Sequence, residues 1–541
     1  MFKRPASMLS PRPLANVFCL AFAGLFALHA AQGATIQSDI CIYGGTSAGV
    51  IAAVQAAKMG RTVVLVEPGR HLGGLTSGGL GATDIGNKAA IGGLSRNFYG
   101  RLGQHYGKPE AWTFEPSVAE NEFNTLVREA KIPVHFRAPL VSVQTENARL
   151  GALTTAGGDT FRAREFIDAT YEGDLMAKAG VKYFVGREAN ATCGETLDGI
   201  RATTPKHQFI VPVDPYVKTG DPASGLLPFI QSVPFGQPGD GDPCVQAYNF
   251  RLCLTQNPAN RKPIDPPADY DPAKYELLGR YFDALAAANK PVTLKTFLKI
   301  DMVTPEKTDI NNNGAFSTDF IGENYDYPNA DYATRERIQA AHLDYIKGLL
   351  TYLATSPRVP DSVRTNMQAW GLCRDEFTDN GGWPHQMYVR EARRMVSAYV
   401  MAEKNCRRTE IVPDSVGLAA YNMDSHNCRR LVRNGHVENE GDVQVPPMSP
   451  YPISYRAIVP APGQCENLLV PVCLSATHIA YGSIRMEPVF MILGQSAATA
   501  AVLAMDDDVP VQKVDYAKLQ KRLLADGQIL EWTKPAKSKP Q

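Results

Sequence analysis

Seven residues near the start of the chain have the types and spacing needed to hold a dinucleotide. Gly44 permits a tight turn, and Gly49 permits close packing of the segment that follows. Backbone amides exposed at such a turn can bind a pyrophosphate, and Glu67, eighteen residues beyond Gly49, can bind a ribose hydroxyl. The predicted pyrophosphate site comprises Gly44, Gly45, Thr46, Ser47, Ala48 and Gly49.

Two strands and a helix must position these residues. Residues 40–43 and 62–66 are predicted to be buried strands, and an alanine-rich helix is predicted between them. This order is that of a dinucleotide-binding βαβ unit, although the same turn can occur in a Rossmann-like domain without a ligand. Thr46 replaces the usual middle glycine. Its β-carbon should crowd a phosphate, although its hydroxyl could donate a hydrogen bond to one.

Composition indicates a soluble globular protein. The chain has 541 residues, of which 44% are hydrophobic and 20% charged, so two or more intertwined domains are expected. Its 55 basic residues balance 55 acidic ones, which gives no indication of a nucleic-acid partner or an anionic membrane surface. The ten cysteines contain no C-x-x-C pattern, so zinc and iron–sulfur sites are not expected, whereas disulfides of unspecified pairing are possible.

The N-terminus has the pattern of a signal peptide. Lys3, Arg4 and Arg12 precede an apolar run over residues 17–30, and small residues follow as far as Ala34. A short membrane anchor is the alternative, but the run is shorter than the roughly 20 residues that a span needs. We therefore expect residues 1–34 to be removed and the protein to be exported, periplasmic or secreted, without a stable membrane anchor.

Several further motifs carry a resemblance to a known family. The chain resembles the bacterial FAD-dependent oxidoreductases of the glutathione-reductase and fumarate-reductase type, and in particular their exported subfamily. The resemblance covers nearly all of the chain after the predicted signal peptide. The matching segments are residues 66–68, 71–74, 168–175, 248–255, 388–394, 424–427, 485–488 and 494–495.

The resemblance implies that FAD is the resident dinucleotide. Gly44, Gly49 and Glu67 would contact its ADP half. The chain has a single strand–glycine–helix fingerprint, whereas reductases that also hold NAD(P)H usually have two. The other cofactor-binding residues implied by the resemblance are the doublet Gly73 and Gly74, then Val141, Ala169 and Thr170 near the adenine, and Met486 and Glu487 at a helix start facing the flavin.

The fold class expected is α/β. A Rossmann-like FAD/NAD(P)-binding parallel sheet would carry an antiparallel meander over residues 134–162 and an interleaved α+β capping region. The predicted domains are a signal peptide (1–34), the N-terminal part of the FAD-binding domain (35–190), a substrate or capping region (191–455), the C-terminal part of the FAD-binding domain (456–525) and a tail (526–541). Later helices are expected over residues 275–289, 332–355, 388–403 and 487–505.

Five residues in or near the matching segments are candidates for catalysis. A neutral histidine near the flavin could take the hydroxyl proton of an alcohol, and His385, His426 and His478 are the candidates. Arg390 and Arg485 could hold a carboxylate or a developing alkoxide. For each histidine the alternative is a hydrogen-bonded structural residue. For the segment 388–394 the alternative is a buried ion-pair network.

Two other features could carry chemistry of a different kind. His71 precedes the glycine doublet and is a candidate for covalent flavin attachment, with a loop residue near the cofactor as the alternative. Residues 309–314 match the start of a calcium loop, but Phe320 stands where its bidentate Glu belongs. No metal site is therefore predicted.

The predicted function is hydride transfer from a small polar substrate to FAD. A carbohydrate or a hydroxy acid would suit the compartment and the polar candidate residues, and the electron acceptor is unknown. One alternative is a flavin-dependent elimination or isomerisation, which would leave the flavin spectrum unbleached. Another is a non-catalytic exported binding protein, which would hold FAD weakly.

Overall fold

A five-stranded parallel sheet forms the centre of the computed structural model, which describes residues 33–533. Its strand order is β22-β8-β2-β3-β4. The strands are β2 (Ile40–Tyr43), β3 (Val63–Val66), β4 (Val134–His135), β8 (Glu165–Asp168) and β22 (Leu468–Leu469). Every residue of β2, β3 and β8 is buried, as expected for parallel strands covered on both faces. The predicted α/β class is confirmed.

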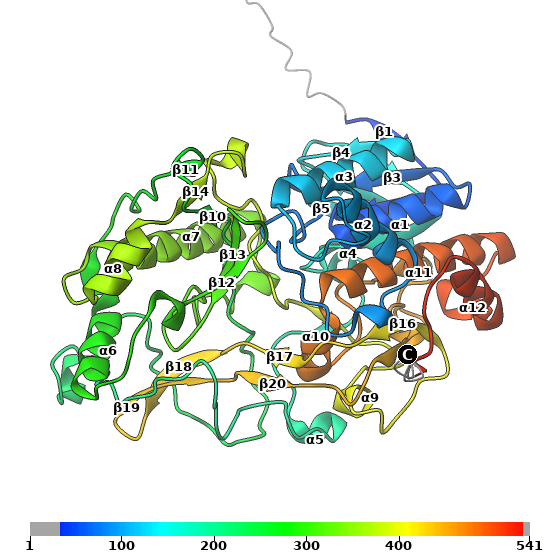
Figure 1. Ribbon diagram of the computed structural model, residues 1–541. Coiled ribbons are helices and arrows are strands. Elements are labelled where there is room, and N and C mark those ends of the chain that lie inside the picture. Colours follow the sequence, from blue (N-terminus) through cyan, green and yellow to red (C-terminus); the bar gives the residue numbers. More distant parts are fainter. Residues whose placement is uncertain (1–32, 534–541) are drawn as a thin grey trace, which may run out of the picture.

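Segments from the two ends of the chain build this part of the molecule together. Strand β22 pairs with β8, although about 300 residues separate them. Figure 1 shows the early blue and late orange helices lying side by side. Most of the predicted signal peptide, residues 1–32, and the end of the tail, residues 534–541, lie outside the described part.

Two helices pack face to face next to the sheet. Helix α1 (Ser47–Lys58) contacts α11 (Glu487–Asp507) extensively. A β-carbon on Gly494 would lie 2.3 Å from the carbonyl oxygen of Ala48, so glycine is what permits this approach. The other helices in this part are α2 (Gly93–His105), α3 (Pro116–Glu129) and α12 (Tyr516–Ala525).

Helix α11 is long and apolar enough to cross a membrane by composition alone. It has 21 residues, and its most apolar window has a mean hydropathy of 1.6. That window is 94% buried inside the protein, where it forms part of the core.

The predicted antiparallel meander is confirmed over residues 140–162 only, because its expected first strand, at residues 134–136, is instead β4 of the parallel sheet. Its strands, in spatial order, are β1, β7, β6 and β5. Strand β1 is an addition to the prediction, and it pairs in parallel with β7. The bounds are β1 (Thr35–Gln37), β5 (Leu140–Glu146), β6 (Arg149–Thr155) and β7 (Thr160–Arg162).

The middle of the chain forms a second lobe, green in Figure 1. Its helices are α6 (Glu276–Ala287), α7 (Tyr332–Thr355) and α8 (Asp361–Gln368). They pack beside a sheet of β10 (Leu254–Thr255), β14 (Gly371–Cys373) and β11 (Arg261–Lys262), and a hairpin of β12 (Leu298–Met302) and β13 (Thr308–Asn312).

The described chain also contains three further strand pairs and several short helices. The pairs are β16 (Ser415–Ala419) with β21 (Tyr451–Ser454), β17 (Met423–Ser425) with β20 (Val443–Val445), and β18 (Arg429–Arg433) with β19 (His436–Glu440). The short helices are α4 (Asp174–Lys178), α5 (Asn190–Cys193), α9 (Glu403–Cys406) and α10 (His478–Ile484).

The helix predicted over residues 388–403 is wrong. This segment is mostly irregular and contains β15 (Arg394–Met395), which pairs with β9 (Tyr183–Phe184). Its polar residues are buried and each bonds to a different part of the chain: Arg390 to Asp319, Arg393 to Asp174 and Arg394 to Glu188. These partners lie on different sides of the segment. Successive side chains of an extended backbone point to opposite sides and can reach them, whereas residues on one face of a helix point the same way.

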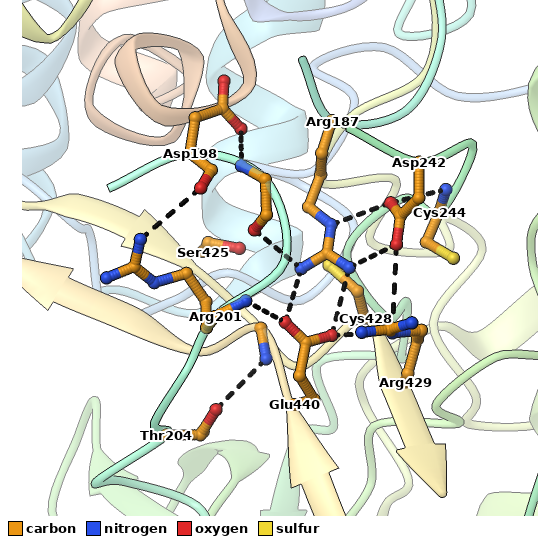
Figure 2. A network of polar contacts seen from close by, with 12 residues as sticks. Arg187, Asp198, Arg201, Thr204, Asp242, Cys244, Ser425, Cys428, Arg429 and Glu440 are labelled. Carbon is orange, nitrogen blue, oxygen red and sulfur yellow. Dashed lines mark hydrogen bonds and ion pairs between the residues drawn. The ribbon is translucent and has the colours of Figure 1, made fainter. Parts of the chain in front are cut away.

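A buried ion-pair network ties the loop after β9 to the hairpin β18–β19 (Figure 2). Arg187 bonds to Asp242 at 2.5 Å and to Glu440 at 2.8 Å, and Arg429 bonds to the other oxygen of Glu440 at 2.8 Å. The amide of Arg201 also donates to Glu440, at 2.6 Å. Removal of one member would leave the other charges buried without a partner, which is costly.

Candidate active site

A small cavity opens beside the glycine turn at the carboxyl ends of β2 and β3. Its volume is about 250 Å³. Its lining includes Gly44, Thr46, Glu67, Pro68, Gly69, Thr170, Tyr332, Arg335, His385 and Gln386. The turn therefore faces open space at the edge of the sheet where dinucleotides bind in this class of fold.

Glu67 holds the turn in shape. Its carboxylate accepts hydrogen bonds from the amides of Gly45, at 2.6 Å, and Gly69, at 2.5 Å. Burial raises the pKa of Glu67 to about 7, although the two amides act to lower it. Gly44 has a φ of +101°, and a β-carbon there would lie 2.8 Å from the backbone of Ala169. The turn and Ala169–Thr170 are therefore in direct contact.

Thr46 does not offer its hydroxyl to a phosphate in this structure. The hydroxyl donates to the carbonyl oxygen of Ala169 at 2.7 Å and accepts from the amide of Gly49 at 3.3 Å. It thereby caps the N-terminus of α1 and joins the turn to β8. This differs from the expectation that the hydroxyl could bond to phosphate, and the reason is that two backbone partners occupy it.

The glycine doublet and the start of α11 meet next to the turn. The amide of Gly73 donates to the carbonyl oxygen of Gly45 at 2.8 Å. The carboxylate of Glu487 accepts from the hydroxyls of Ser47 at 2.5 Å, Thr76 at 2.8 Å and Tyr171 at 2.7 Å. Met486 is the N-cap residue of α11 and Glu487 its first residue, so the positive end of this helix lies beside Ser47 at the turn.

Val141 is the one predicted cofactor residue whose side chain is exposed. Val141 is on β5 with 54% of its surface exposed, and it is not among the residues lining the small cavity. Alternation along the strand turns it outward, whereas Leu140 beside it is buried.

The remaining residues fit an ADP-bearing cofactor. The turn supplies a backbone that can approach a pyrophosphate closely, α1 begins at it, and Glu67 presents an acid at the end of β3. These groups would hold the ADP half of FAD, and the start of α11 would face its other half.

A larger cavity of about 550 Å³ lies between the two lobes. The two cavities are lined by residues close together in sequence: Gln386 lines the small cavity, and Tyr388 lines the larger one. Its lining includes Asp84, Lys206, His207, Gln208, Lys299, Asn311, Asn312, Asn313, Tyr388, Tyr421, Asn422, Asp424, His426 and Gln444. Neutral amides and hydroxyls are therefore the main polar groups at its wall.

His426 is the catalytic candidate that faces this cavity. Its Nδ1 lies 2.8 Å from Asp319 and its Nε2 lies 3.5 Å from Asp424. Burial and the charge of Arg390 act to lower the pKa of His426, but the two carboxylates outweigh them and raise it above the ordinary histidine value. His207, on the same wall, has its pKa lowered to about 4, first by burial and then by the charge of His426.

Three arginines surround the ring of Tyr388. The guanidinium carbons of Arg251, Arg390 and Arg485 lie 5.7, 4.5 and 5.6 Å from the ring centre. Arg485 also donates to the Tyr388 hydroxyl at 2.8 Å. These cations act to lower the pKa of Tyr388, but burial dominates and raises it.

Arg390 and Arg485 are not placed as the sequence predicted. Neither is among the residues lining the larger cavity. Arg390 bonds to Asp319 at 3.0 Å, and Arg485 bonds to Asp424 at 3.0 Å. Each guanidinium is therefore paired with a carboxylate that contacts His426, which is the arrangement of the ion-pair alternative for segment 388–394.

His478 also differs from the prediction. Only 1% of its surface is exposed, and it lines neither cavity. Its Nδ1 lies 2.8 Å from Glu391 and its Nε2 lies 2.8 Å from the hydroxyl of Ser425. The order acid–histidine–serine is that of a hydrolytic triad, but Ser425 is fully buried and cannot reach a substrate. His478 fixes the strand that carries Asp424.

His385 lies on the cofactor side. Its ring stacks on that of His71 with 3.8 Å between the ring centres, and it lines the small cavity. Burial, followed by the charges of His71 and Arg70, lowers the pKa of His385 to about 3. His71 is itself paired with Glu120 at 2.7 Å. The three predicted histidines thus lie in three places, and one of them faces the larger cavity.

Sequence reasoning missed several residues of this site. Asp319 lies in no recognised motif, and nothing in its spacing could have indicated that it contacts His426. His207 comes from a long loop with no pattern. By contrast, Tyr388 and Asp424 belong to matching segments, so their presence near His426 could have been inferred from those motifs.

Three solved structures match parts of this chain. A thioredoxin reductase of T. acidophilum is 19% identical, with a TM-score of 0.17, over 24% of this chain and 34% of that one. An L-amino acid deaminase of Proteus vulgaris is 14% identical, with a TM-score of 0.21, over 28% and 53%. A 3-ketosteroid-Δ4-(5α)-dehydrogenase of Rhodococcus jostii RHA1 is 14% identical, with a TM-score of 0.20, over 26% and 48%. The chain thus spans about a third to a half of the length of these structures.

A family model matches the chain over most of its length. No curated protein matches it. The model described as FAD dependent oxidoreductase matches residues 39–523, which include the glycine turn, Glu67, His426 and the start of α11. The chain belongs to the FAD-dependent oxidoreductase family.

Proposed function

We propose that this oxidoreductase oxidises an alcohol group of a neutral, polyhydroxylated small molecule, of the carbohydrate class, in the larger cavity. The observation that carries the proposal is the wall of that cavity. It combines one histidine of raised pKa with neutral amides from residues 311–313 and from Gln208, Asn422 and Gln444. Amides can both donate and accept hydrogen bonds, which suits a molecule with many hydroxyls.

The charges around the cavity favour a neutral substrate over a hydroxy acid. A carboxylate is best held by an arginine fork, and Arg390 and Arg485 are already paired behind the wall. The lining includes two lysines, of which Lys299 is paired with Asp301 at 3.0 Å and Lys206 donates to Gln444 at 2.8 Å. Asp84 and Asp424 would repel an anion.

His426 would accept the proton of the substrate hydroxyl. In its neutral form Nδ1–H donates to Asp319, which leaves Nε2 as the acceptor. Asp319 fixes the orientation of the ring, and Arg390 keeps Asp319 ionised by lowering its pKa against the effect of burial. FAD, when bound, would supply the hydride acceptor. The electron acceptor that reoxidises it is a separate partner.

Export of the mature protein is part of the proposal. It is supported by the basic residues, the apolar run and the small residues of segment 1–34. A free sugar or sugar alcohol is a substrate available in such a compartment.

The test is anaerobic mixing of the FAD-loaded protein with separate panels of neutral sugars, sugar alcohols and hydroxy acids. We expect a neutral polyhydroxylated compound to bleach the flavin absorbance and a carbonyl product to form. Bleaching by hydroxy acids alone would contradict the proposed substrate class. Turnover with an unchanged spectrum would instead support elimination or isomerisation, and a protein that takes up no FAD would support the binding-protein alternative.

A further inference from the structure

We propose that Cys253 and Cys373 form a disulfide that cross-links two segments of the second lobe. Their sulfurs lie 3.7 Å apart. Both side chains are buried, under Phe377. No other sulfur–sulfur contact of this kind occurs within residues 33–533.

The backbone is placed for the bond. Strands β10 and β14 are antiparallel, with Leu254 opposite Leu372, and the same register continued one residue beyond β10 sets Cys253 opposite Cys373. Directly opposed residues in such a ladder have Cα atoms about 4.5 to 5.5 Å apart. That spacing lies within the range of about 4.4 to 6.8 Å found for disulfides. Side-chain rotation alone can therefore bring the sulfurs together.

The two strands lead into residues of the proposed active site. Arg251, two residues before Cys253, packs on the ring of Tyr388 and pairs with Asp309 at 2.6 Å. Asn249 forms a strand bridge with Tyr388 itself. The chain after Cys373 returns to the same place through residues 374–388. The disulfide would thus join residues 120 positions apart in the sequence. It would also restrain the two segments that meet at Tyr388, residues 249–253 and 373–388.

The oxidant required is a disulfide of the thiol-exchange class, such as oxidised glutathione or a protein disulfide. One thiolate of the pair attacks it, forms a mixed disulfide and releases one thiol. The second thiolate attacks the cysteine sulfur of that mixed disulfide, forms the Cys253–Cys373 bond and releases the second thiol. Two electrons pass to the oxidant, and the two cysteine protons end on the released thiols.

Burial determines when this exchange is fast. The contact with Cys373 and burial raise the pKa of Cys253, so the thiolate is scarce in the folded protein. Exchange is therefore expected while β10 and β14 are still pairing, and the completed bond is shielded from reductants by the same packing. A longer closed loop also stabilises more through the unfolded state.

The experiment uses the full chain, folded in a buffer of oxidised and reduced glutathione, then quenched with acid, alkylated and digested. Mass spectrometry is expected to find a peptide pair joined through Cys253 and Cys373 that separates on reduction, with a mass gain of two hydrogens. The proposal would be overturned if both cysteines were fully alkylated, or if either were joined to a third cysteine.

Single variants supply the control for stability. Cys253→Ser and Cys373→Ser should each abolish the joined peptide. The Tm of each oxidised variant should match that of reduced wild type and lie several degrees below that of oxidised wild type. Cys41→Ser removes a buried thiol from β2 and should leave the joined peptide intact. The peptide map of the wild type decides the question even if a variant fails to fold.

Discussion

Among individual residues, the protonation of His426 depends on two buried carboxylates, each of which also pairs with an arginine. Asp319 contacts both His426 and Arg390, and Asp424 contacts both His426 and Arg485. Each carboxylate thus neutralises an arginine and stabilises the protonated form of the same histidine. This arrangement raises the pKa of His426 in spite of burial, and it sets the pH at which the histidine can accept a proton.

The first prediction concerns this pH. His426 must be neutral to act as a base, so activity should be lost as the pH falls through its raised pKa. Asp319→Asn removes a negative charge next to the ring and should move the midpoint of the kcat/KM profile to lower pH by about 1 unit or more. The measurement is the pH profile of both proteins.

Asp309, on β13, offers a matched control. Asp309 is also buried and pairs with a buried arginine, Arg251, but does not contact His426. Asp309→Asn should lower stability in a similar way and leave the midpoint unchanged. An unshifted midpoint in Asp319→Asn would contradict the proposed role of Asp319.

At the level of secondary-structure elements, the close contact between α1 and α11 positions the residues predicted to bind FAD. The two helices begin at the glycine turn and at Glu487, which meet through the hydroxyl of Ser47. Any separation of the helix axes would move both starts. Gly494 permits the contact, because a β-carbon there would lie 2.3 Å from the backbone oxygen of Ala48.

Gly494→Ala should therefore destabilise the protein by about 1–3 kcal/mol through overpacking and weaken FAD binding. Denaturant unfolding and FAD titration are the measurements. Gly151→Ala is the control, because a β-carbon on Gly151 in β6 would lie 3.8 Å from its nearest neighbour, in ordinary contact. Equal stability and FAD affinity in the two variants would show that the contact between α1 and α11 has room for a β-carbon at residue 494.

At the scale of the whole molecule, buried ion pairs join segments that are distant in sequence. Glu440 accepts from Arg187 and Arg429, and through them the loop after β9 is fixed to the hairpin β18–β19 (Figure 2). Burial acts to raise the pKa of Glu440, but the arginines outweigh it and hold the pKa below its usual value. Its contribution to stability is present above the unfolded value of about 4.3 and is lost as the pH falls through the lowered pKa.

Glu440→Gln should lower the free energy of unfolding by about 3–5 kcal/mol at pH 7, because two arginines lose a buried partner. The difference from wild type should shrink below about pH 4. Glu438→Gln, on the same strand but in a partly exposed pair with Arg433 at 3.5 Å, should cost at most about 1 kcal/mol. Equal losses in the two variants would contradict the role of the network.

The sequence predicted the cofactor side of this molecule better than the substrate side. The glycine turn, Glu67 and the two flanking strands are local in sequence, so spacing alone indicates them. On the substrate side, Asp319 contacts His426 from 107 residues away and has no local signal. The helix predicted over residues 388–403 failed for the same reason, since partners distant in sequence override a local pattern. The domain boundaries remain predictions.

His426 is proposed to accept the substrate proton in the larger cavity. The most direct test of this role is the rate of anaerobic flavin reduction by a bleaching substrate in His426→Asn, compared with His436→Asn on the partly exposed hairpin strand β19. We expect the first variant to keep its FAD spectrum and lose about 10²–10⁴-fold in rate, and the second to match wild type. A wild-type rate in FAD-loaded His426→Asn would show that His426 is not the proton acceptor.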